Sequence, residues 1–203
     1  MAIAAVVTIN TAAYLLVNAQ PLRTPTLLPV TALDQWIGWH AWTIWPYWLL
    51  LAMNPFLALC IRQRRLLLAT LRAYALAMGI NFVVWIAWPT SIVRAALPEG
   101  LDGATRLAWQ ALHALDAPNN CFPSGHITIP VVVMAGVIAQ HPRARRWLWL
   151  PLLLFPSILT TDQHYFVDLV GGLATALIGI ALVGQALWRP AASPAWVQAP
   201  TKP

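Results

Sequence analysis

Two short polar motifs lie within an otherwise apolar chain. The first, Pro-Ser-Gly-His, occupies residues 123–126 directly before an apolar run, and the second, His-Tyr-Phe-Val-Asp, occupies residues 164–168. His164 and Asp168 are four residues apart, so on a helix both side chains project from one face. A carboxylate one turn from an imidazole fixes the tautomer of the ring and stabilises its cationic form. The second motif therefore predicts a catalytic histidine.

The first motif places small polar residues at the start of a predicted helix. Unpaired backbone N–H groups and the helix dipole both favour an anion at such a position. Taken alone, Ser124 and Gly125 predict no more than a turn and a helix cap. His164 also lies at the N-terminal end of a predicted helix, so the two motifs together predict a phosphate cradle with His126 beside it.

The elements that must position these motifs are transmembrane helices. Of the 203 residues, 60% are hydrophobic, only 9% are charged and 12 are Trp, a composition typical of a membrane protein. The apolar runs predict six spans at residues 3–18, 37–61, 66–88, 127–139, 147–161 and 164–188. We therefore expect an all-α fold, a bundle of six transmembrane helices. It would form a single integral membrane domain over residues 1–203, with a disordered tail at residues 190–203.

The net charge of +6 comes from short basic clusters between the apolar runs. Such clusters indicate membrane topology and argue against a nucleic-acid partner, because they form no continuous basic face. The clusters at residues 62–65 and 141–146 predict cytoplasmic loops. With six spans, both termini are then cytoplasmic, whereas residues 91–125 and the turn near Asp162 lie outside. Both histidine motifs are therefore expected at the extracytoplasmic face.

Two further segments predict contact with the membrane surface. Five tryptophans recur every third residue, at positions 36, 39, 42, 45 and 48, which suits packing and interface anchoring. Residues 105–116 have helical apolar spacing and are expected to lie flat on the membrane surface. We assign both segments to anchoring rather than to catalysis.

The two motifs, whose histidines are 38 positions apart, resemble those of the type 2 phosphatidic acid phosphatase (PAP2) superfamily, six-helix membrane enzymes that act on lipid phosphates. The family's active-site residues are matched one for one by Ser124, Gly125, His126, His164 and Asp168. The resemblance implies that His164 attacks phosphorus to form a phosphohistidine while Asp168 orients the imidazole. His126 would protonate the departing oxygen and then activate the acceptor. It implies no metal and no cofactor.

The chain departs from the family pattern at its cationic positions. The family has a Lys with Arg-Pro seven residues later, but the only lysine here is Lys202. The family's Ser-Arg pair before the second histidine reads Ser157-Ile158. The nearest replacement is Arg94, which is followed by Ala95 rather than Pro. We therefore expect Arg94 to bind phosphate together with the backbone at the start of the first motif.

The second motif is similar to the His-Tyr-x-x-Asp pattern of one branch of this superfamily, the inositol-phosphorylceramide and sphingomyelin synthases with their bacterial relatives. That branch contains both transferases and hydrolases. The resemblance implies a phosphatase or phosphotransferase of the bacterial inner membrane, with a lipid phosphate as substrate and membrane lipids as its other partners. Two alternatives remain: a non-enzymatic lipid transporter or packing protein with buried polar pairs, and a hydrolase whose His and Asp residues hold zinc.

Overall fold

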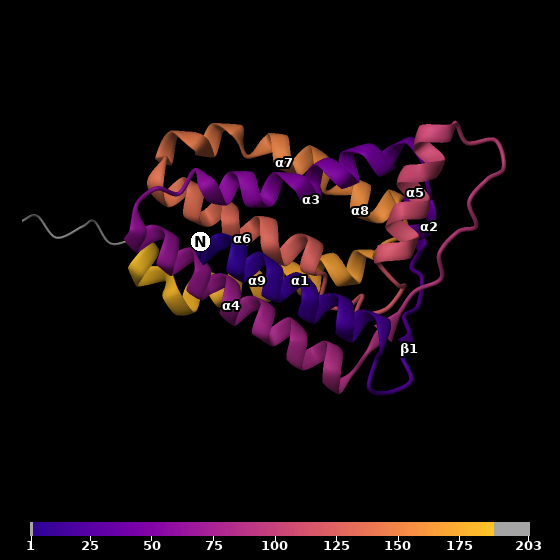
Figure 1. Cartoon of the computed structure of the whole chain (residues 1–203), viewed down its shortest axis with the longest axis horizontal. Helices are drawn as coiled ribbons and strands as arrows, with labels where there is room; N and C mark the ends of the chain where they lie inside the picture. The colour runs from indigo at the N-terminus through magenta and orange to yellow at the C-terminus, as the bar shows by residue number, and fades with distance from the viewer. Residues whose placement is uncertain (1, 189–203) are drawn as a thin grey trace, which may run out of the picture.

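Long helices lie side by side along the long axis of the molecule (Figure 1). The computed structural model of the chain describes residues 2–188, which are mostly helical. The predicted tail at 190–203 and Lys202 lie outside the described residues. The long helices are α1 (Ala2–Ala19), α3 (Ile44–Leu59), α4 (Arg64–Ala87), α6 (Gly125–Gln140) and α9 (Phe166–Trp188). The shorter helices α7 (Trp149–Leu154) and α8 (Pro156–Thr160) follow one another beside α3 (Figure 1).

Small residues hold α4, α6 and α9 close together. A Cβ atom at Gly179 would lie 2.6 Å from the backbone oxygen of Ala73, and Ala77 is fully buried nearby. A Cβ atom at Gly172 would overlap the backbone oxygen of Ser124. Glycine and alanine at these crossings let helix backbones approach directly. The start of α6 is therefore held against α9, and these are the helices that carry the two motifs.

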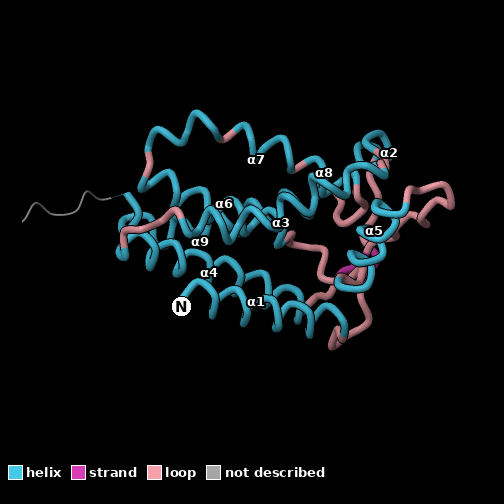
Figure 2. Tube along the Cα trace, turned by 45° about the horizontal axis from the view of Figure 1, so that its top comes forward, coloured by secondary structure: helices cyan, strands magenta, loops and turns pink. Residues whose placement is uncertain are grey.

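Short elements gather at one end of the bundle, where Figure 2 shows α2 and α5 together with the strands. They are α2 (Ala32–Ile37), α5 (Gly103–Leu115), β1 (Thr26–Leu27) and β2 (Thr90–Ser91), and the two strands pair in parallel. Asp102 caps α5 by accepting the N–H of Thr105 at 3.0 Å. The helix predicted near residues 105–116 is confirmed, and it buries Trp109 and Leu112. Its position on a membrane surface stays a prediction.

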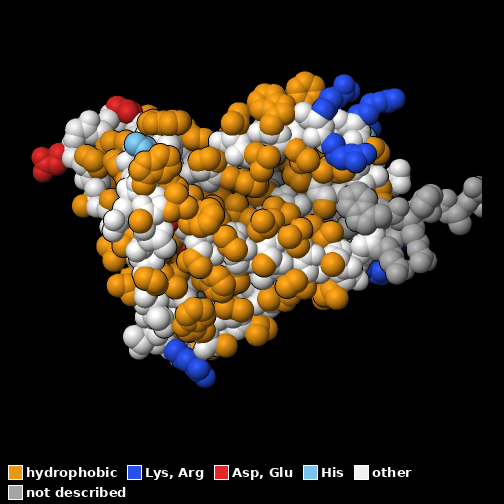
Figure 3. Space-filling model, turned by 180° about the vertical axis from the view of Figure 1, so that it is seen from behind, with side chains coloured by type: hydrophobic (Ala, Val, Ile, Leu, Met, Phe, Trp, Pro, Cys, Tyr) orange, Lys and Arg blue, Asp and Glu red, His pale blue; other side chains and the backbone are white. Residues whose placement is uncertain are grey.

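The two basic loops meet at the opposite end of the bundle. Gln140 accepts the N–H of Gln63 at 2.8 Å and donates to the backbone oxygen of Cys60 at 2.9 Å, so it joins the two loops directly. Figure 3 shows the Lys and Arg side chains of one face near the two ends, with hydrophobic side chains between them. This distribution is the one expected of a bundle whose middle lies in hydrocarbon.

Two of the described helices are long and apolar enough to cross a membrane, residues 64–87 of α4 and 166–184 of α9. The helices α1 and α6 are apolar but shorter. The predicted fifth span at 147–161 follows η2 (Pro142–Trp147) and contains two short helices, α7 and α8, which meet at Phe155 rather than forming one continuous helix. Pro156 begins α8, and a proline fits the first turn of a helix because it has no N–H to offer an intrahelical bond. The six-span bundle therefore stays a prediction.

The predicted second span, residues 37–61, also begins later than expected. Its first residues form the end of α2, a short connection and the 3₁₀ turn η1 (Ala41–Thr43), and α3 starts at Ile44. Of the five regularly spaced tryptophans, Trp36, Trp42 and Trp45 are exposed. Trp39 and Trp48 pack against the core instead. The packing part of the expectation is thus met by Trp39 and Trp48, although residues 36–48 do not form one continuous helix, and anchoring by the exposed tryptophans stays a prediction.

Candidate active site

The two motifs meet where α6 and α9 begin. Ser124 is the N-cap of α6, and its N–H donates to the backbone oxygen of Asp168 at 3.0 Å. The same turn is held by the close approach of Gly172 to the Ser124 carbonyl. Residues that lie more than forty positions apart in sequence are thus joined through backbone groups. This contact sets the relative position of the two histidines, since each lies within a few residues of it.

The histidines and the aspartate form a continuous polar chain. His126 Nδ1 lies 2.8 Å from His164 Nε2, a hydrogen-bond distance. His164 Nδ1 lies 3.4 Å from Asp168 Oδ2, an ion-pair contact that does not meet hydrogen-bond geometry. Asp168 Oδ2 also accepts the N–H of Tyr165 at 2.9 Å. With exposed fractions of 4% for His164 and 0% for Asp168, the pair is shielded from water.

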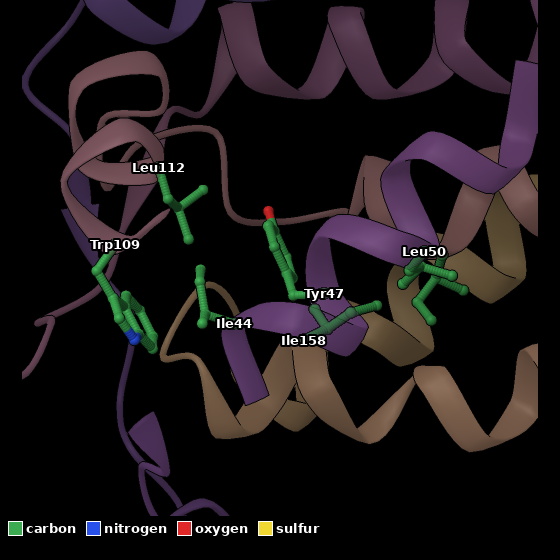
Figure 4. Close-up of a cluster of buried hydrophobic side chains, with 7 residues drawn as sticks. Ile44, Tyr47, Leu50, Trp109, Leu112 and Ile158 are labelled. Atoms are coloured by element: carbon green, nitrogen blue, oxygen red, sulfur yellow. The ribbon is translucent and has the colours of Figure 1, made fainter. Parts of the chain in front are cut away.

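Tyr47 extends this chain, and the sequence analysis missed it. Its hydroxyl lies 2.9 Å from His126 Nε2, so both ring nitrogens of that histidine have partners. Tyr47 belongs to α3, is fully buried and lies in a core cluster with Ile44 and Ile158, and Figure 4 shows its hydroxyl pointing away from Ile158. No spacing in the sequence relates Tyr47 to either motif, because the contact depends on how α3 packs against α6.

With both histidines neutral, one placement of protons is compatible with every contact from Tyr47 through the two histidines to Asp168. Tyr47 donates to His126 Nε2, His126 Nδ1–H donates to His164 Nε2, and the remaining proton of His164 is on Nδ1, facing Asp168. If His164 Nε2–H donated to His126 Nδ1 instead, a neutral His164 would turn an unprotonated Nδ1 toward the Asp168 carboxylate, which is repulsive. We therefore assign the Nδ1–H tautomer to His126, with its proton aimed at His164.

Arg94 lies beside the polar chain and is held by Gln163, Asp116 and the backbone oxygen of Ala117. Its guanidinium donates to Gln163 Oε1 at 2.6 Å and to the backbone oxygen of Asp116, and it forms an ion pair of 3.8 Å with the Asp116 carboxylate. Asp116 Oδ1 in turn accepts the Tyr14 hydroxyl at 2.7 Å. Burial raises the pKa of the Asp116 carboxyl, and the Tyr14 hydrogen bond and the Arg94 charge oppose that rise. The guanidinium therefore contacts Gln163, the residue before His164, and is paired with the carboxylate of Asp116.

The end of α1 holds the segment that contains Asp116. Asn18 donates to the backbone oxygens of Ala117 at 3.0 Å and Asn119 at 2.9 Å, and its own side-chain oxygen accepts the N–H of Ala117 at 2.7 Å. Asn119 donates back to the Asn18 backbone oxygen at 3.0 Å. The Asn18 side chain thus bonds backbone groups of both Ala117 and Asn119, and these bonds fix the loop beside Arg94 to α1.

Two cavities reach the polar chain from different sides. The first, here called the apolar groove, has a volume of about 350 Å³ and lies between α1, α3, α4 and α6, with His126, Tyr47, Asp116 and Gly125 at one end. The second, here called the outer cavity, has a volume of about 550 Å³. His164 and Arg94 line it together with other outer-loop residues, namely Asp34, Gln35, Asp162 and Tyr165. Each histidine therefore opens on its own cavity.

The predicted phosphate ligands are not equally open. Gly125 lines the apolar groove and Arg94 lines the outer cavity. Ser124 lines neither of these two cavities, and its hydroxyl is fully buried without a hydrogen-bond partner among the described residues. The Ser124 N–H is already used by Asp168. Phosphate contact in this structure is therefore open to Gly125 and Arg94, whereas the Ser124 hydroxyl is buried and has no partner among the described residues.

The described residues do not assemble a metal site. No group of three or more His, Cys, Asp and Glu side chains within residues 2–188 is arranged to hold a metal ion. In the chain of contacts described above, His126 uses both ring nitrogens on Tyr47 and His164. The predicted zinc alternative would require these contacts to be broken.

Comparison with known proteins adds one finding. A family model described as the PAP2 superfamily matches residues 31–182, which is well over half of the chain. The matched segment contains both histidine motifs, Tyr47 and Arg94, and it begins after α1. Neither a curated protein nor a solved structure matches the chain. The narrower resemblance to the inositol-phosphorylceramide and sphingomyelin synthase branch stays a prediction.

Proposed function

Because this chain belongs to the PAP2 superfamily, we propose that it is a membrane phosphatase or phosphotransferase that acts on lipid phosphates through a phosphohistidine. The observation that supports this proposal most directly is the hydrogen-bonded histidine pair, in which only His164 has a carboxylate behind it. A carboxylate on one ring favours the cationic, phosphorylated state of that ring. The asymmetry supports His164 as the nucleophile and His126 as the acid and base.

The reaction would proceed in two displacements. His164 Nε2 attacks phosphorus, the bond from phosphorus to the lipid oxygen breaks, and His126 Nδ1–H gives its proton to that oxygen. A hydroxyl or water then loses its proton to His126 and attacks phosphorus, and the bond to His164 breaks. The two nitrogens are in direct contact at 2.8 Å, so the phosphoryl group must replace their hydrogen bond when it binds. The nucleophile is thus covered until substrate arrives.

Charge on the transferring group would be balanced by the groups around it. Arg94 supplies the cation, and Gly125 supplies a backbone N–H at the start of α6. Ser124 remains in the proposal as a phosphate ligand because its buried hydroxyl has no partner among the described residues. Asp168 accepts from Tyr165 and contacts His164, and it would balance the imidazolium that forms.

We place the site at the extracytoplasmic face of the bacterial inner membrane, in a single six-span domain with both termini cytoplasmic. The support is that the two basic loops share the end of the bundle opposite α2 and α5, and that the histidine motifs lie toward the latter end.

A phosphate-trapping experiment tests the proposal. The purified protein is incubated with phosphatidate, a lysophosphatidate or an isoprenoid phosphate carrying labelled phosphorus, and is quenched in alkali, which preserves phosphohistidine. Label on the wild type that is absent from His164→Ala supports the assignment, as does release of the lipid alcohol. His126→Ala should slow a lipid substrate far more than a nitrophenyl phosphate, whose leaving group needs little protonation.

The alternatives predict different results. A lipid transporter or a packing protein would give neither label nor product with any of the three lipids, and that result would refute the proposal. A metal-dependent hydrolase would release product that disappears on strong chelation, without labelled protein.

A further inference from the structure

The partition between the two cavities is made of two polar pairs. Each pair has one member on either side: His126 and Asp116 line the apolar groove, whereas His164 and Arg94 line the outer cavity. The members of each pair touch, at 2.8 Å for the histidines and 3.8 Å for the ion pair. A phosphoryl group bound between the histidines would therefore have one cavity on the side of its nucleophile and the other on the side of its acid.

The geometry of phosphoryl transfer decides which side the acceptor must use. The attacking and leaving groups lie roughly in line through phosphorus. When phosphorus is bonded to His164 Nε2, the in-line position opposite that bond lies on the His126 side. The alcohol that leaves in the first step and the acceptor that enters in the second both occupy this position. A hydroxyl that enters through the apolar groove arrives on the His126 side, whereas water in the outer cavity arrives on the side of the nucleophile.

The apolar groove that meets His126 has the length and lining of a site for a hydrocarbon chain. On α3 its lining runs from Tyr47 to Ala58, about 16 Å at the helical rise, which is close to half the hydrocarbon thickness of a bilayer. Most of the lining is apolar, with contributions from α1 such as Ile3, Val6 and Val7. A lipid can thus place its chain in the groove and its terminal oxygen beside His126.

From these observations we propose that the phosphoryl acceptor is the hydroxyl of a membrane lipid, which reaches the phosphohistidine through the apolar groove. The inference rests on the proposed function and selects transfer over hydrolysis. Phosphorus moves from the donor oxygen to His164 and then to the acceptor oxygen. The His126 proton goes to the first alcohol and is replaced by the proton of the second. The net reaction exchanges a phosphate between two lipid alcohols and needs no further reactant.

The test compares acceptors with the same donor. The wild-type protein and phosphatidate are incubated in mixed micelles with either dodecanol or glycerol, and free phosphate and each new phosphate ester are measured by mass. We expect dodecyl phosphate to exceed free phosphate as dodecanol is added, and glycerol to accept little. Equal use of glycerol, or free phosphate alone at every alcohol concentration, would overturn the inference.

A matched pair of variants tests the route. Val7→Trp narrows the groove from α1, where Val7 is 42% exposed, and should lower transfer to dodecanol by about tenfold. Val83→Trp makes the same change on α4 at a residue that is 68% exposed and does not line the groove, and it should leave transfer unchanged. Equal effects of the two variants would contradict entry of the acceptor through the groove.

Labelled phosphohistidine separates this inference from the proposed function. Label on His164 together with free phosphate as the only product would retain the proposed function and reject the lipid acceptor. Absence of label and of product would reject both.

Discussion

Tyr47→Phe isolates the contact that the sequence motifs do not contain. The substitution removes only the hydroxyl, which lies 2.9 Å from His126 Nε2, and keeps the ring in its buried cluster. Without this donor, the His126 proton is free to move from Nδ1 to Nε2, where it no longer faces the reacting oxygen. The loss of a hydrogen bond to a buried acceptor costs about 1–3 kcal/mol, which corresponds to a fall in kcat of about 5-fold to 160-fold.

The assay compares two leaving groups in the same variant. With a lipid phosphate the alcohol needs the proton of His126, so kcat should fall by the full amount, whereas with nitrophenyl phosphate it should change little. The melting temperature should fall by only a few degrees, because one hydrogen bond is lost while the packing of the ring is retained. Tyr74→Phe is the comparison variant: it removes a hydroxyl from the wall of the same groove that makes none of the described hydrogen bonds, so any effect it has on lipid binding should not shift the tautomer of His126 or depend on the leaving group. Equal loss with both leaving groups, or loss in neither, would refute the role of Tyr47 in fixing the tautomer.

Three further changes follow from the structure. Arg94→Ala should lower kcat by about 10² or more with normal folding, as measured by steady-state kinetics, and near-normal turnover would remove Arg94 from the phosphate site. Gly172→Ala should lower both the melting temperature and activity because its new methyl group meets the backbone before α6, whereas Gly79→Ala, with open space around it, should do neither. A topology reporter near Asp102 should read extracytoplasmic and one after Arg65 cytoplasmic, and a cytoplasmic signal near Asp102 would reverse the proposed orientation.

The local part of the site was predictable from the sequence, because one helix turn fixes the spacing of its residues. His164 and Asp168 lie on one face of the same segment, and the structure places their polar atoms 3.4 Å apart. The partner of His126 was not predictable in the same way. Tyr47 precedes it by 79 residues, and their contact depends on the rotation and depth of α3, which no local pattern sets.

The same contrast between local features and features set by packing holds for the secondary structure. The apolar runs correctly predicted helices near α1, α4, α6 and α9, since length and hydropathy are properties of each segment alone. The run at 147–161 was equally apolar, but it is divided into shorter helices at Pro156. Arg94 was predicted to bind phosphate from its position before the first motif. No local pattern indicated that Asp116 and Gln163 hold its guanidinium, because their loops meet only through the packing at the end of the bundle.

The Asn18 contacts have a consequence for where the working unit of this protein begins. The family match starts at residue 31, so α1 lies wholly ahead of it. Yet α1 supplies Asn18, which fixes the loop after α5, and Tyr14, which binds the carboxylate that pairs with Arg94. A chain trimmed to the matched segment would retain every residue of the two motifs and the direct partners of Arg94, but it would lose the α1 side chains that hold Asp116 and its loop, together with one wall of the groove. The family match thus covers the residues proposed to carry out the reaction, while α1, which lies ahead of the match, helps to hold those residues in position.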